Sequence, residues 1–423
     1  FPISAYGGLY KSTNAGVSFT TQSTTPNILS WSEFPPQTGG GGQGWYDLAI
    51  EVDPNNADIV YVGGVNIFKS TNSGVNWDCA AHWVGSATAA AVHADHHWFA
   101  YNPADGRLYS ANDGGLHYTA NGGNTWTELS SGLGIAQIYK IGMSKTTYAK
   151  VLNGYQDNGT ALWDGNIFRT ERGGDGMESV IDHTNDNIMY ASVYYGNIAR
   201  STNNGNSFGG FAANGTNGIT EEGAWVTPYI LDNKNSDIMF IGYKNVWRTT
   251  SATQGNVTFT AISNSLAGSN NWNMRQLRQS KVNENRLFAI RSDNRFFRSD
   301  NALAASPTWL DLTSSLPASG VLRDVETDPH NNNTIWISRG NDIWKSTNSG
   351  STWSNISANL PDLSFNTIIT DPNSYGGVYV AATSGIYYTD DSLANWVTYA
   401  DSFPDNVPTR ELDIYHESGN WEN

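Results

Sequence analysis

The sequence predicts an all-β fold: a single large β-propeller whose blades are four-stranded sheets, about nine in number and alternatively about ten. Three observations indicate this class. A sequence unit recurs along the 423 residues, a short turn motif recurs within that unit, and the composition combines 43 Gly with 16 Trp, 21 Tyr and 15 Phe. Glycines supply turns and aromatic side chains supply a large apolar core, which excludes both a coiled coil and a disordered chain.

The repeated unit is clearest at residues 53–77 and 328–353, which share an Asp-Pro start, an apolar run, and the string Lys-Ser-Thr-Asn-Ser-Gly before a Trp. Looser copies occupy residues 101–126, 182–208, 231–259, 279–309 and 371–396, and a part copy lies at 6–19. Short apolar runs bounded by turn-forming residues are typical of strands. In one copy we expect four strands, at Trp45–Val52, Ile59–Gly63, Asn66–Ser70 and Val75–Asp78. A further unit without the turn motif is expected at residues 134–172.

The turn motif reads [Ser/Thr]-x-Asn-x-Gly-x-x-[Trp/Phe]. It occurs five times, beginning at Ser12, Ser70, Thr119, Ser201 and Ser346. We expect the hydroxyl and the Asn side chain to bond backbone groups of the hairpin, and the Gly to adopt a positive φ. We expect the aromatic residue to wedge against the neighbouring blade, so the motif has a structural role.

The two ends of the chain complement each other. Residues 1–19 provide the last three strands of a unit, whereas residues 410–416 look like a first strand with nothing after it. If these ends pair, the ring closes through one shared blade and residues 1–423 form a single propeller. If the chain is a piece of a longer precursor, ten blades become the alternative. We expect a monomeric ring, whether complete or part of a longer multidomain precursor.

Charge and composition exclude several functions. The 39 acidic residues outnumber 23 basic ones, for a formal net charge of −16, whereas nucleic-acid binding needs a basic face. One cysteine, Cys79, excludes a disulfide framework and a Cys-based zinc site. No apolar run reaches the roughly 18 residues of a membrane span, and the first residues lack a signal-peptide pattern, as expected of a mature or trimmed form. Abundant Asn, Thr, Ser and Gly favour a secreted, extracellular or cell-surface bacterial protein.

The turn motif resembles the Asp-box, or bacterial-neuraminidase (BNR) repeat, of sialidases, xyloglucanase-type glycoside hydrolases and the sortilin propeller, with Asn in the usual Asp position. Longer strings at residues 92–97, 112–115, 156–159 and 173–178 resemble secreted Bacteroidetes propellers of the type IX secretion group, often labelled sortilin-like or glycosyl hydrolase. The resemblance covers nearly the whole chain and implies export. Because the Arg-Ile-Pro element of sialidases is missing and xyloglucanases use two propellers facing a cleft, no catalytic residue transfers from either family.

Candidate catalytic residues follow from propeller geometry. The start of each first strand and the turn between the second and third strands emerge on one face near the axis. In a glycosidase, two carboxyl groups there act as general acid and as base or nucleophile. The candidates are Asp95, Asp113, Asp157, Asp175 and Glu178. A second interpretation is a metal site with His93 and Asp95 on one side of a strand and His96 on the other. In a third, the same groups only plug the channel through buried hydrogen bonds.

Candidate binding residues lie at the corresponding places of other units. They are Arg275, Arg291, Arg323, Arg339, Tyr194 and Tyr195. Guanidinium groups bind carboxylate or sulfate bidentately. The sequence therefore predicts a propeller that recognises an anionic extracellular polysaccharide at the axial mouth. If the protein is an enzyme, it cleaves this polysaccharide as a hydrolase or a lyase. The alternative is a non-catalytic, sortilin-like binding or adhesion scaffold for protein or cell-surface ligands. Neither interpretation requires a cofactor, and both are compatible with a bound divalent cation.

Overall fold

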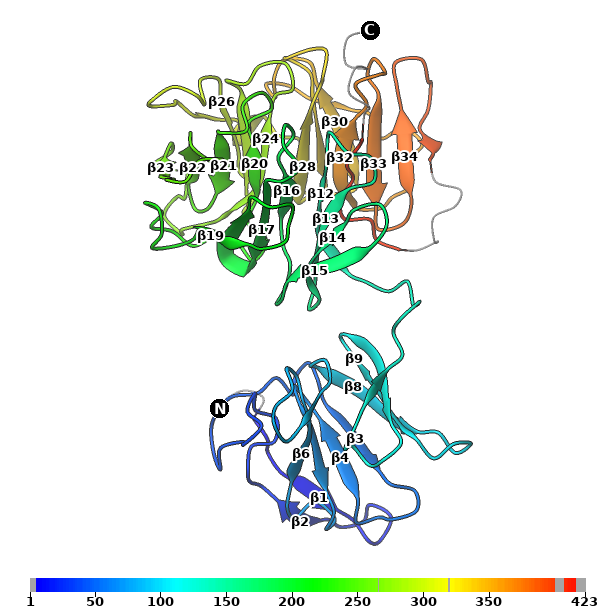
Figure 1. Cartoon of the computed structure of the whole chain (residues 1–423). Helices are drawn as coiled ribbons and strands as arrows, with labels where there is room; N and C mark the ends of the chain where they lie inside the picture. Colours follow the sequence, from blue (N-terminus) through cyan, green and yellow to red (C-terminus); the bar gives the residue numbers. More distant parts are fainter. Residues whose placement is uncertain (1–4, 265, 319, 400–406, 416–423) are drawn as a thin grey trace. The chain divides into compact units, whose positions relative to one another are not determined.

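The chain is almost entirely strand and turn (Figure 1). The computed structural model describes residues 5–264, 266–318, 320–399 and 407–415. These residues form nine sheets, of which seven have four strands, one has five and one has two. This confirms the predicted all-β class and its four-stranded blades. The two helical segments, η1 (Tyr194–Gly196) and η2 (Thr313–Ser315), are single 3-10 turns. Nowhere in the described ranges is there a helix with the length and apolarity that crossing a bilayer demands.

The chain divides into two compact units, residues 1–135 and 136–423, called unit 1 and unit 2. Unit 1 contains a two-stranded sheet, a five-stranded sheet and a four-stranded sheet. In order, these are β1 (Leu9–Lys11) and β2 (Thr20–Ser23); β3 (Ala49–Val52), β4 (Val60–Gly63), β5 (Ile67–Ser70), β6 (Asp78–His82) and β7 (Ala90–Ala91); and β8 (His96–Tyr101), β9 (Leu108–Asn112), β10 (Gly115–Thr119) and β11 (Thr127–Glu128).

Unit 2 contains six four-stranded sheets, each an antiparallel series of strands consecutive in sequence. The first three are β12 (Ile138–Met143), β13 (Val151–Tyr155), β14 (Gly159–Trp163), β15 (Phe168–Arg172); β16 (Ser179–Ile181), β17 (Met189–Val193), β18 (Asn197–Ser201), β19 (Gly209–Ala212); and β20 (Tyr229–Leu231), β21 (Met239–Gly242), β22 (Val246–Thr249), β23 (Thr260–Ala261). The others are β24 (Met274–Gln279), β25 (Leu287–Arg291), β26 (Phe296–Ser299), β27 (Leu310–Asp311); β28 (Leu322–Thr327), β29 (Ile335–Arg339), β30 (Asp342–Ser346), β31 (Ser354–Asn355); and β32 (Phe365–Thr370), β33 (Val378–Ala382), β34 (Ile386–Thr389), β35 (Val397–Thr398).

The turn motif has the hydrogen bonds expected of it. In the copy after β5, Ser70 Oγ accepts the N–H of Gly74 at 2.8 Å, and Asn72 Oδ1 accepts the N–H of Asn76 at 2.8 Å. Gly74 has a φ of 86°. The indole N–H of Trp77 donates to Ser23 in β2, at 3.0 Å, so the aromatic residue contacts the neighbouring sheet. Because these bonds hold residues 70–76 in a turn, β6 starts at residue 78 and not at residue 75 as predicted.

Other strand predictions can be checked directly. The unit predicted at residues 134–172 without the turn motif exists, as β12–β15. The strand predicted from residue 45 begins at residue 49, because Tyr46 and Asp47 donate their backbone N–H groups to the carbonyl of Gln43 and form a turn. This turn places polar side chains in front of the strand.

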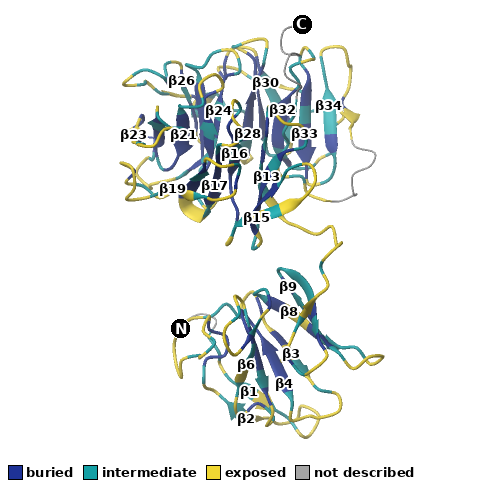
Figure 2. Cartoon of the chain, in the orientation of Figure 1, coloured by how far each residue is buried: buried dark blue, intermediate teal, exposed yellow. Residues whose placement is uncertain are grey.

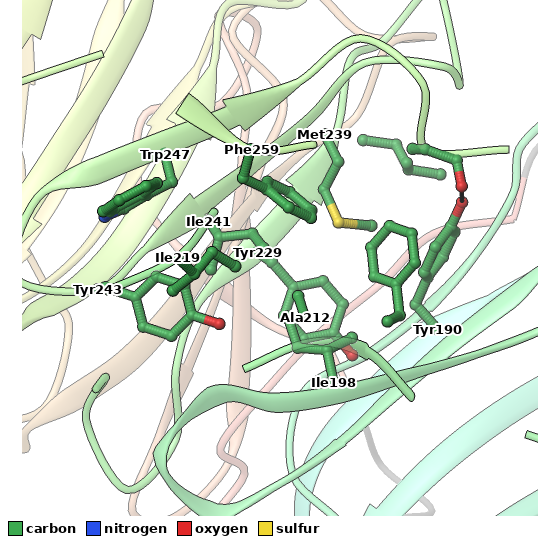
Figure 3. Packing of buried hydrophobic residues seen from close by; sticks show 13 residues of the cluster. Tyr190, Ile198, Ala212, Ile219, Tyr229, Met239, Ile241, Tyr243, Trp247 and Phe259 are labelled. Atoms are coloured by element: carbon green, nitrogen blue, oxygen red, sulfur yellow. Dashed lines mark hydrogen bonds between the residues drawn. The ribbon is translucent and has the colours of Figure 1, made fainter. Parts of the chain in front are cut away.

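Large apolar side chains fill the space between consecutive sheets, while loops carry most of the exposed residues (Figure 2). Figure 3 shows one such layer, in which Tyr190 of β17 packs with Tyr229, Ile241 and Phe259. The Tyr190 hydroxyl donates to the carbonyl of Ala252 at 2.9 Å, which gives its polar end a partner. Complete burial of a side chain of this size contributes about 1.5–3 kcal/mol. Packing between sheets therefore holds unit 2 together.

The described C-terminal residues, 407–415, belong to unit 2 and link its first and last sheets. Asn366 of β32 donates its amide to the carbonyl of Thr409 at 2.9 Å, and Glu411 Oε2 accepts the N–H of Ile141 in β12 at 2.7 Å. Glu411 therefore contacts the β12 backbone through its side-chain carboxylate and not through a backbone hydrogen bond between strands. Residues 410–415 form no regular strand, although a strand was predicted there. Residues 1–4 and 416 lie outside the described residues, so a blade shared between the chain ends stays a prediction.

Candidate functional site

Three acidic side chains of unit 1 gather in the loops that precede β3 and β8 and in the β9–β10 turn. The amide of Gln43 donates to Asp95 Oδ1 at 2.5 Å and to Asp47 Oδ2 at 3.2 Å. Asp113 offers a carboxylate oxygen within 4.8 Å of one from Asp95. We call Asp47, Asp95 and Asp113 the acidic cluster. Two of its members are among the predicted catalytic residues, and the structure brings these two together.

Asp113 is oriented by two neighbours. The Tyr46 hydroxyl donates to Asp113 Oδ2 at 2.5 Å, and His97 Nε2 lies 2.6 Å from Oδ1. The rings of Tyr46 and His97 meet edge to face, with centroids 5.0 Å apart. These contacts hold the Asp113 carboxylate in one orientation, as a functional carboxylate requires.

Burial and mutual repulsion disfavour the charged forms of two carboxyl groups in the acidic cluster, Asp47 and Asp95. Burial raises the pKa of Asp47 to about 7, and the charge of Asp95 adds to this effect against the Gln43 hydrogen bond. The pKa of Asp95 is also raised, by burial and then by the charge of Asp113. The Asp47 side chain is fully buried, and its Oδ1 has no hydrogen-bond partner. Like charges in a partly dry site favour either a shared proton or a counter-ion.

The histidines beside the cluster play different parts. His96 is fully buried with Nδ1 2.8 Å from Ser110 Oγ, and burial lowers its pKa to about 3, so it is a neutral core residue. The strand alternation invoked to pair His93 with Asp95 is wrong, because β8 begins at residue 96 and Asp95 has a φ of 66°. His93 still lies within electrostatic reach of Asp95. Metal binding by His93 and Asp95 stays a prediction.

Unit 2 carries a group of aromatic side chains, which we call the aromatic face: the half-buried Tyr139 and the exposed Tyr194, Tyr195 and Trp225. The rings of Tyr194 and Trp225 stack with centroids 5.2 Å apart and an interplanar angle of 16°. Tyr195 meets both rings edge-on. Tyr194, Tyr195 and Trp225 are 41%, 51% and 41% exposed. The predicted binding residues Tyr194 and Tyr195 therefore form one surface with Trp225.

Two predicted catalytic carboxylates lie beside this surface. The Trp225 indole donates to the Tyr139 hydroxyl at 3.2 Å. Burial raises the pKa of Tyr139, and the negative charges of Asp175 and Asp157 raise it further, so both carboxylates lie within electrostatic range of the phenol. Asp175 Oδ1 accepts the backbone N–H of Asp157 at 2.8 Å. Asp157 and Asp175 thus come together at the aromatic face.

Glu178 has a different environment from Asp175. Its side chain is 10% exposed and lies 3.7 Å from Lys140 Nζ, which also contacts Glu411 at 2.9 Å. Burial raises the pKa of Glu178 to about 7, and Glu411 adds to this effect while Lys140 opposes it. These contacts belong to a buried ion network that joins β12 to the C-terminal residues. For Glu178 the geometry favours the channel-plug interpretation.

The predicted arginines are largely engaged within unit 2. Arg291 is 5% exposed and binds Asp293 through Nε and Nη2, each at 2.8 Å. Arg275 donates to two backbone carbonyl groups at 2.8 Å. The pKa of Arg275 is lowered by burial and then by the charge of Arg323, whose own Nε is buried without a hydrogen-bond partner. Burial also lowers the pKa of Arg339. Substrate binding by these four residues stays a prediction.

The sequence interpretation missed Asp47 and its neighbour Gln43 as site residues. A signal was present, because a glycine-rich stretch at residues 39–44 directly precedes Trp45, Tyr46 and Asp47. This position is the start of a first strand, the same place in the unit from which Asp95 was predicted. The positional rule applied to every unit would have identified Asp47.

No protein-family model matches the chain, and no curated protein matches it either. Several solved structures are similar in fold. The BT4673 extracellular domain from B. thetaiotaomicron is 12% identical, with a TM-score of 0.48, over 93% of this chain and 58% of that one. The GH74 enzyme of Niastella koreensis is 13% identical, with a TM-score of 0.27, over 92% and 73% of the two chains.

A third similar structure is the Cps50 (Swd1) β-propeller domain from Myceliophteria thermophila. It is 8% identical, with a TM-score of 0.45, over 64% of this chain and 88% of that one. At these identities the likeness concerns the fold alone, and TM-scores at this level carry no argument about function. The chain spans little more than half of the BT4673 domain.

Proposed function

We propose that the protein recognises an extracellular polysaccharide at the aromatic face of unit 2. The observation that carries this proposal is the exposed, stacked pair of Tyr194 and Trp225. Asp157 and Asp175 act electrostatically on Tyr139, whose hydroxyl accepts from Trp225. Sugar rings present flat C–H faces that pack on aromatic rings, and hydroxyl groups that donate to carboxylates. A surface with both kinds of group is complementary to a chain of sugar residues.

The aromatic face is held in place by its backbone. The N–H of Tyr195 donates to the carbonyl of Trp225 at 3.3 Å, and the N–H of Gly223 donates to the carbonyl of Tyr195 at 3.2 Å. Tyr195 itself has a φ of 62°. These bonds lock the loop before β18 to the loop before β20. A surface ordered in advance loses less conformational entropy when a ligand binds.

An anionic polysaccharide is the substrate class we favour. The Nε of Arg323 lacks a hydrogen-bond partner, and the charges of Arg275 and Arg323 oppose each other. The Arg323 side chain as a whole is only half-buried. A carboxylate or sulfate group beside the accessible part of its guanidinium would offset this repulsion. Arg275 and Arg323 are the second residues of β24 and β28, which are the first strands of two consecutive sheets.

Cleavage would use Asp157 and Asp175 as the two carboxyl groups of a glycosidase. One observation favours the alternative, a non-catalytic binding scaffold. Asp175 already accepts the N–H of Asp157, and Glu178 is tied to Lys140, so these carboxylates also hold the structure. Binding and cleavage therefore need separate measurements.

We place this function outside the cell, in a secreted or surface-bound bacterial protein. Support comes from the acidic composition with 23 basic residues and from the abundance of small polar residues. Fractionation of the native host would test it. Recovery of the protein in the cytoplasmic fraction alone would contradict this part of the proposal.

Binding is tested by titrating a panel of neutral, carboxylated and sulfated polysaccharides into the full chain in a calorimeter. The variant Trp225→Ala should bind at least about fivefold more weakly, since stacking contributes about 1 kcal/mol or more per aromatic pair. Trp31→Ala is the matched control, because Trp31 is 51% exposed and lies in unit 1. Equal binding by Trp225→Ala and the native chain would overturn the proposed site.

Cleavage is tested on the best ligand by assaying new reducing ends and the ultraviolet absorbance of unsaturated products. If the protein is an enzyme, Asp157→Asn should abolish product formation and leave binding within about threefold. If the native chain binds the polysaccharide but forms no product, the protein is a non-catalytic binding scaffold.

A further inference from the structure

We propose that the acidic cluster of unit 1 binds a hard divalent cation, best matched by Ca²⁺, between Asp95 and Asp113. This inference concerns unit 1 and does not depend on the polysaccharide proposal. It rests on three features of the cluster: the approach of its oxygen atoms, an unpartnered buried oxygen, and the support behind the ligands.

The oxygen atoms of Asp95 and Asp113 already lie at a suitable separation. A carboxylate oxygen of each lies within 4.8 Å of the other. Ca²⁺ binds oxygen at about 2.3–2.6 Å, so two ligands on one ion can be up to about 5 Å apart. The two carboxylates can therefore hold one ion without moving the loops that carry them.

The third acidic group supplies the independent observation. Asp47 is fully buried, yet its Oδ1 accepts no hydrogen bond. Buried carboxylate oxygens normally accept a hydrogen bond, because a buried oxygen without one has lost its bonds to water and gained none in return. The neutral amide of Gln43 donates to both Asp47 and Asp95 but cannot cancel their charge. A cation at Asp95 supplies the missing positive charge beside Asp47.

The ligands are also supported from behind. Asp113 is held by the Tyr46 hydroxyl and by His97 Nε2, at 2.5 and 2.6 Å. Outer contacts of this kind orient metal-binding carboxylates and strengthen binding. The Asp95 backbone has a φ of 66°, a conformation that non-glycine residues rarely adopt, and it aims the side chain at Gln43. Strain of this kind is concentrated at binding sites.

The donor set selects the type of ion. Carboxylate oxygens suit hard cations such as Ca²⁺ and Mg²⁺, whereas Zn²⁺ in proteins takes mainly nitrogen and sulfur ligands. His96 is buried in the core with Ser110, so it does not supply nitrogen to the cluster. Ca²⁺ tolerates irregular geometry and solvent ligands better than Mg²⁺ does. We therefore expect Ca²⁺ to bind more tightly than Mg²⁺.

The experiment uses Tb³⁺, which takes oxygen ligands as Ca²⁺ does and luminesces when a nearby aromatic ring transfers energy to it. Tyr46 contacts Asp113 directly, and the Trp45 ring lies 5.6 Å from the Tyr46 ring. Titration of the chelator-treated full chain should give saturable luminescence equivalent to one ion, and Ca²⁺ should displace it. Absence of saturable luminescence in the native chain would overturn the proposal.

Variants locate the site. Asp95→Asn and Asp113→Asn should each weaken Tb³⁺ binding about tenfold or more, whereas Asp105→Asn, an exposed acid of the β8–β9 turn, should leave it unchanged. A variant could also lose Tb³⁺ binding because it is unstable. Melting temperatures measured with chelator and with Ca²⁺ separate this case from the loss of a ligand. Asp95→Asn should match or exceed the native melting temperature in chelator, because it removes like charge, and should lose the upward shift that Ca²⁺ gives the native chain. An equal Ca²⁺ shift in Asp95→Asn would place the ion elsewhere and contradict the proposal.

Discussion

Unit 1 and unit 2 each gather carboxylates in buried places, but they neutralise them in different ways. In unit 2, Lys140 lies 3.7 Å from Glu178, and further cations of β24 and the loop after it face the acids of β28. In unit 1, Asp47 and Asp95 share the neutral amide of Gln43. A buried acid with a cationic partner therefore stabilises the fold. An acid bridged by a neutral donor retains charge that a ligand can use.

The largest expected effect comes from removing the cation of unit 2. Lys140→Met should lower the free energy of unfolding by about 3 kcal/mol, because Glu178 and Glu411 would lose their shared counter-charge. Urea denaturation followed by tryptophan fluorescence measures it. Lys234→Met is the control, since Lys234 is 65% exposed and solvent screens its pair with Glu284. Equal losses in both variants would remove the distinction between the units.

A pH effect on stability should follow from Glu178. Its pKa is raised from 4.5 to about 7 by burial and Glu411, against Lys140. The folded chain therefore holds this proton more tightly than the unfolded chain. The resulting stability is complete below about pH 4.5 and is lost as the pH rises through about 7. Glu178→Gln should remove this component, which denaturation at about pH 5, 6, 7 and 8 would reveal. An unchanged pH slope in the variant would contradict the assignment.

In unit 1 the corresponding substitution should have the opposite sign. Asp47→Asn, in chelator at about pH 8, should stabilise the chain by about 1 kcal/mol, because an amide does not repel Asp95 and can still accept from Gln43. Thermal and urea unfolding measure the change. Asp105→Asn provides the exposed control in the same unit. Marked destabilisation by Asp47→Asn would show that the Asp47 charge is already compensated.

The smallest effect is expected at the aromatic face. Tyr139→Phe removes the oxygen that accepts the Trp225 indole N–H and should cost about 0.5–1 kcal/mol of stability. Polysaccharide binding should fall a few-fold, because Trp225 loses part of its support. Calorimetry and urea unfolding separate the two effects. A binding loss as large as that of Trp225→Ala would indicate that Tyr139 itself contacts the ligand.

Much of the fold could be predicted because its signals are local. The hydroxyl, Asn and Gly of the turn motif bond within eight residues of each other, so the copy at Ser70 forms without information from elsewhere. The sheet β12–β15 was also predicted, although it lacks the motif, because alternating apolar runs and turns suffice to define strands.

The candidate site was predicted only in part. The structure brings a carboxylate oxygen of Asp95 within 4.8 Å of one from Asp113, and Asp175 accepts the backbone N–H of Asp157. Glu178 lies three positions from Asp175 in the sequence but takes part in a buried ion network with Lys140. Nothing in the local sequence separates these two acids. Their fates depend on residues that approach from other strands.

The strands, their turns and the recurrence of the four-stranded sheet follow from the sequence alone, since each depends on residues close together in the chain. The three-dimensional fold sets which acids have cationic partners, as when Glu411 contacts Lys140 across 271 positions of sequence. It also decided which acids are left with neutral donors, as when Gln43 meets Asp95. The physical reason is that charge compensation depends on distance in space, which the order of residues along a strand does not specify.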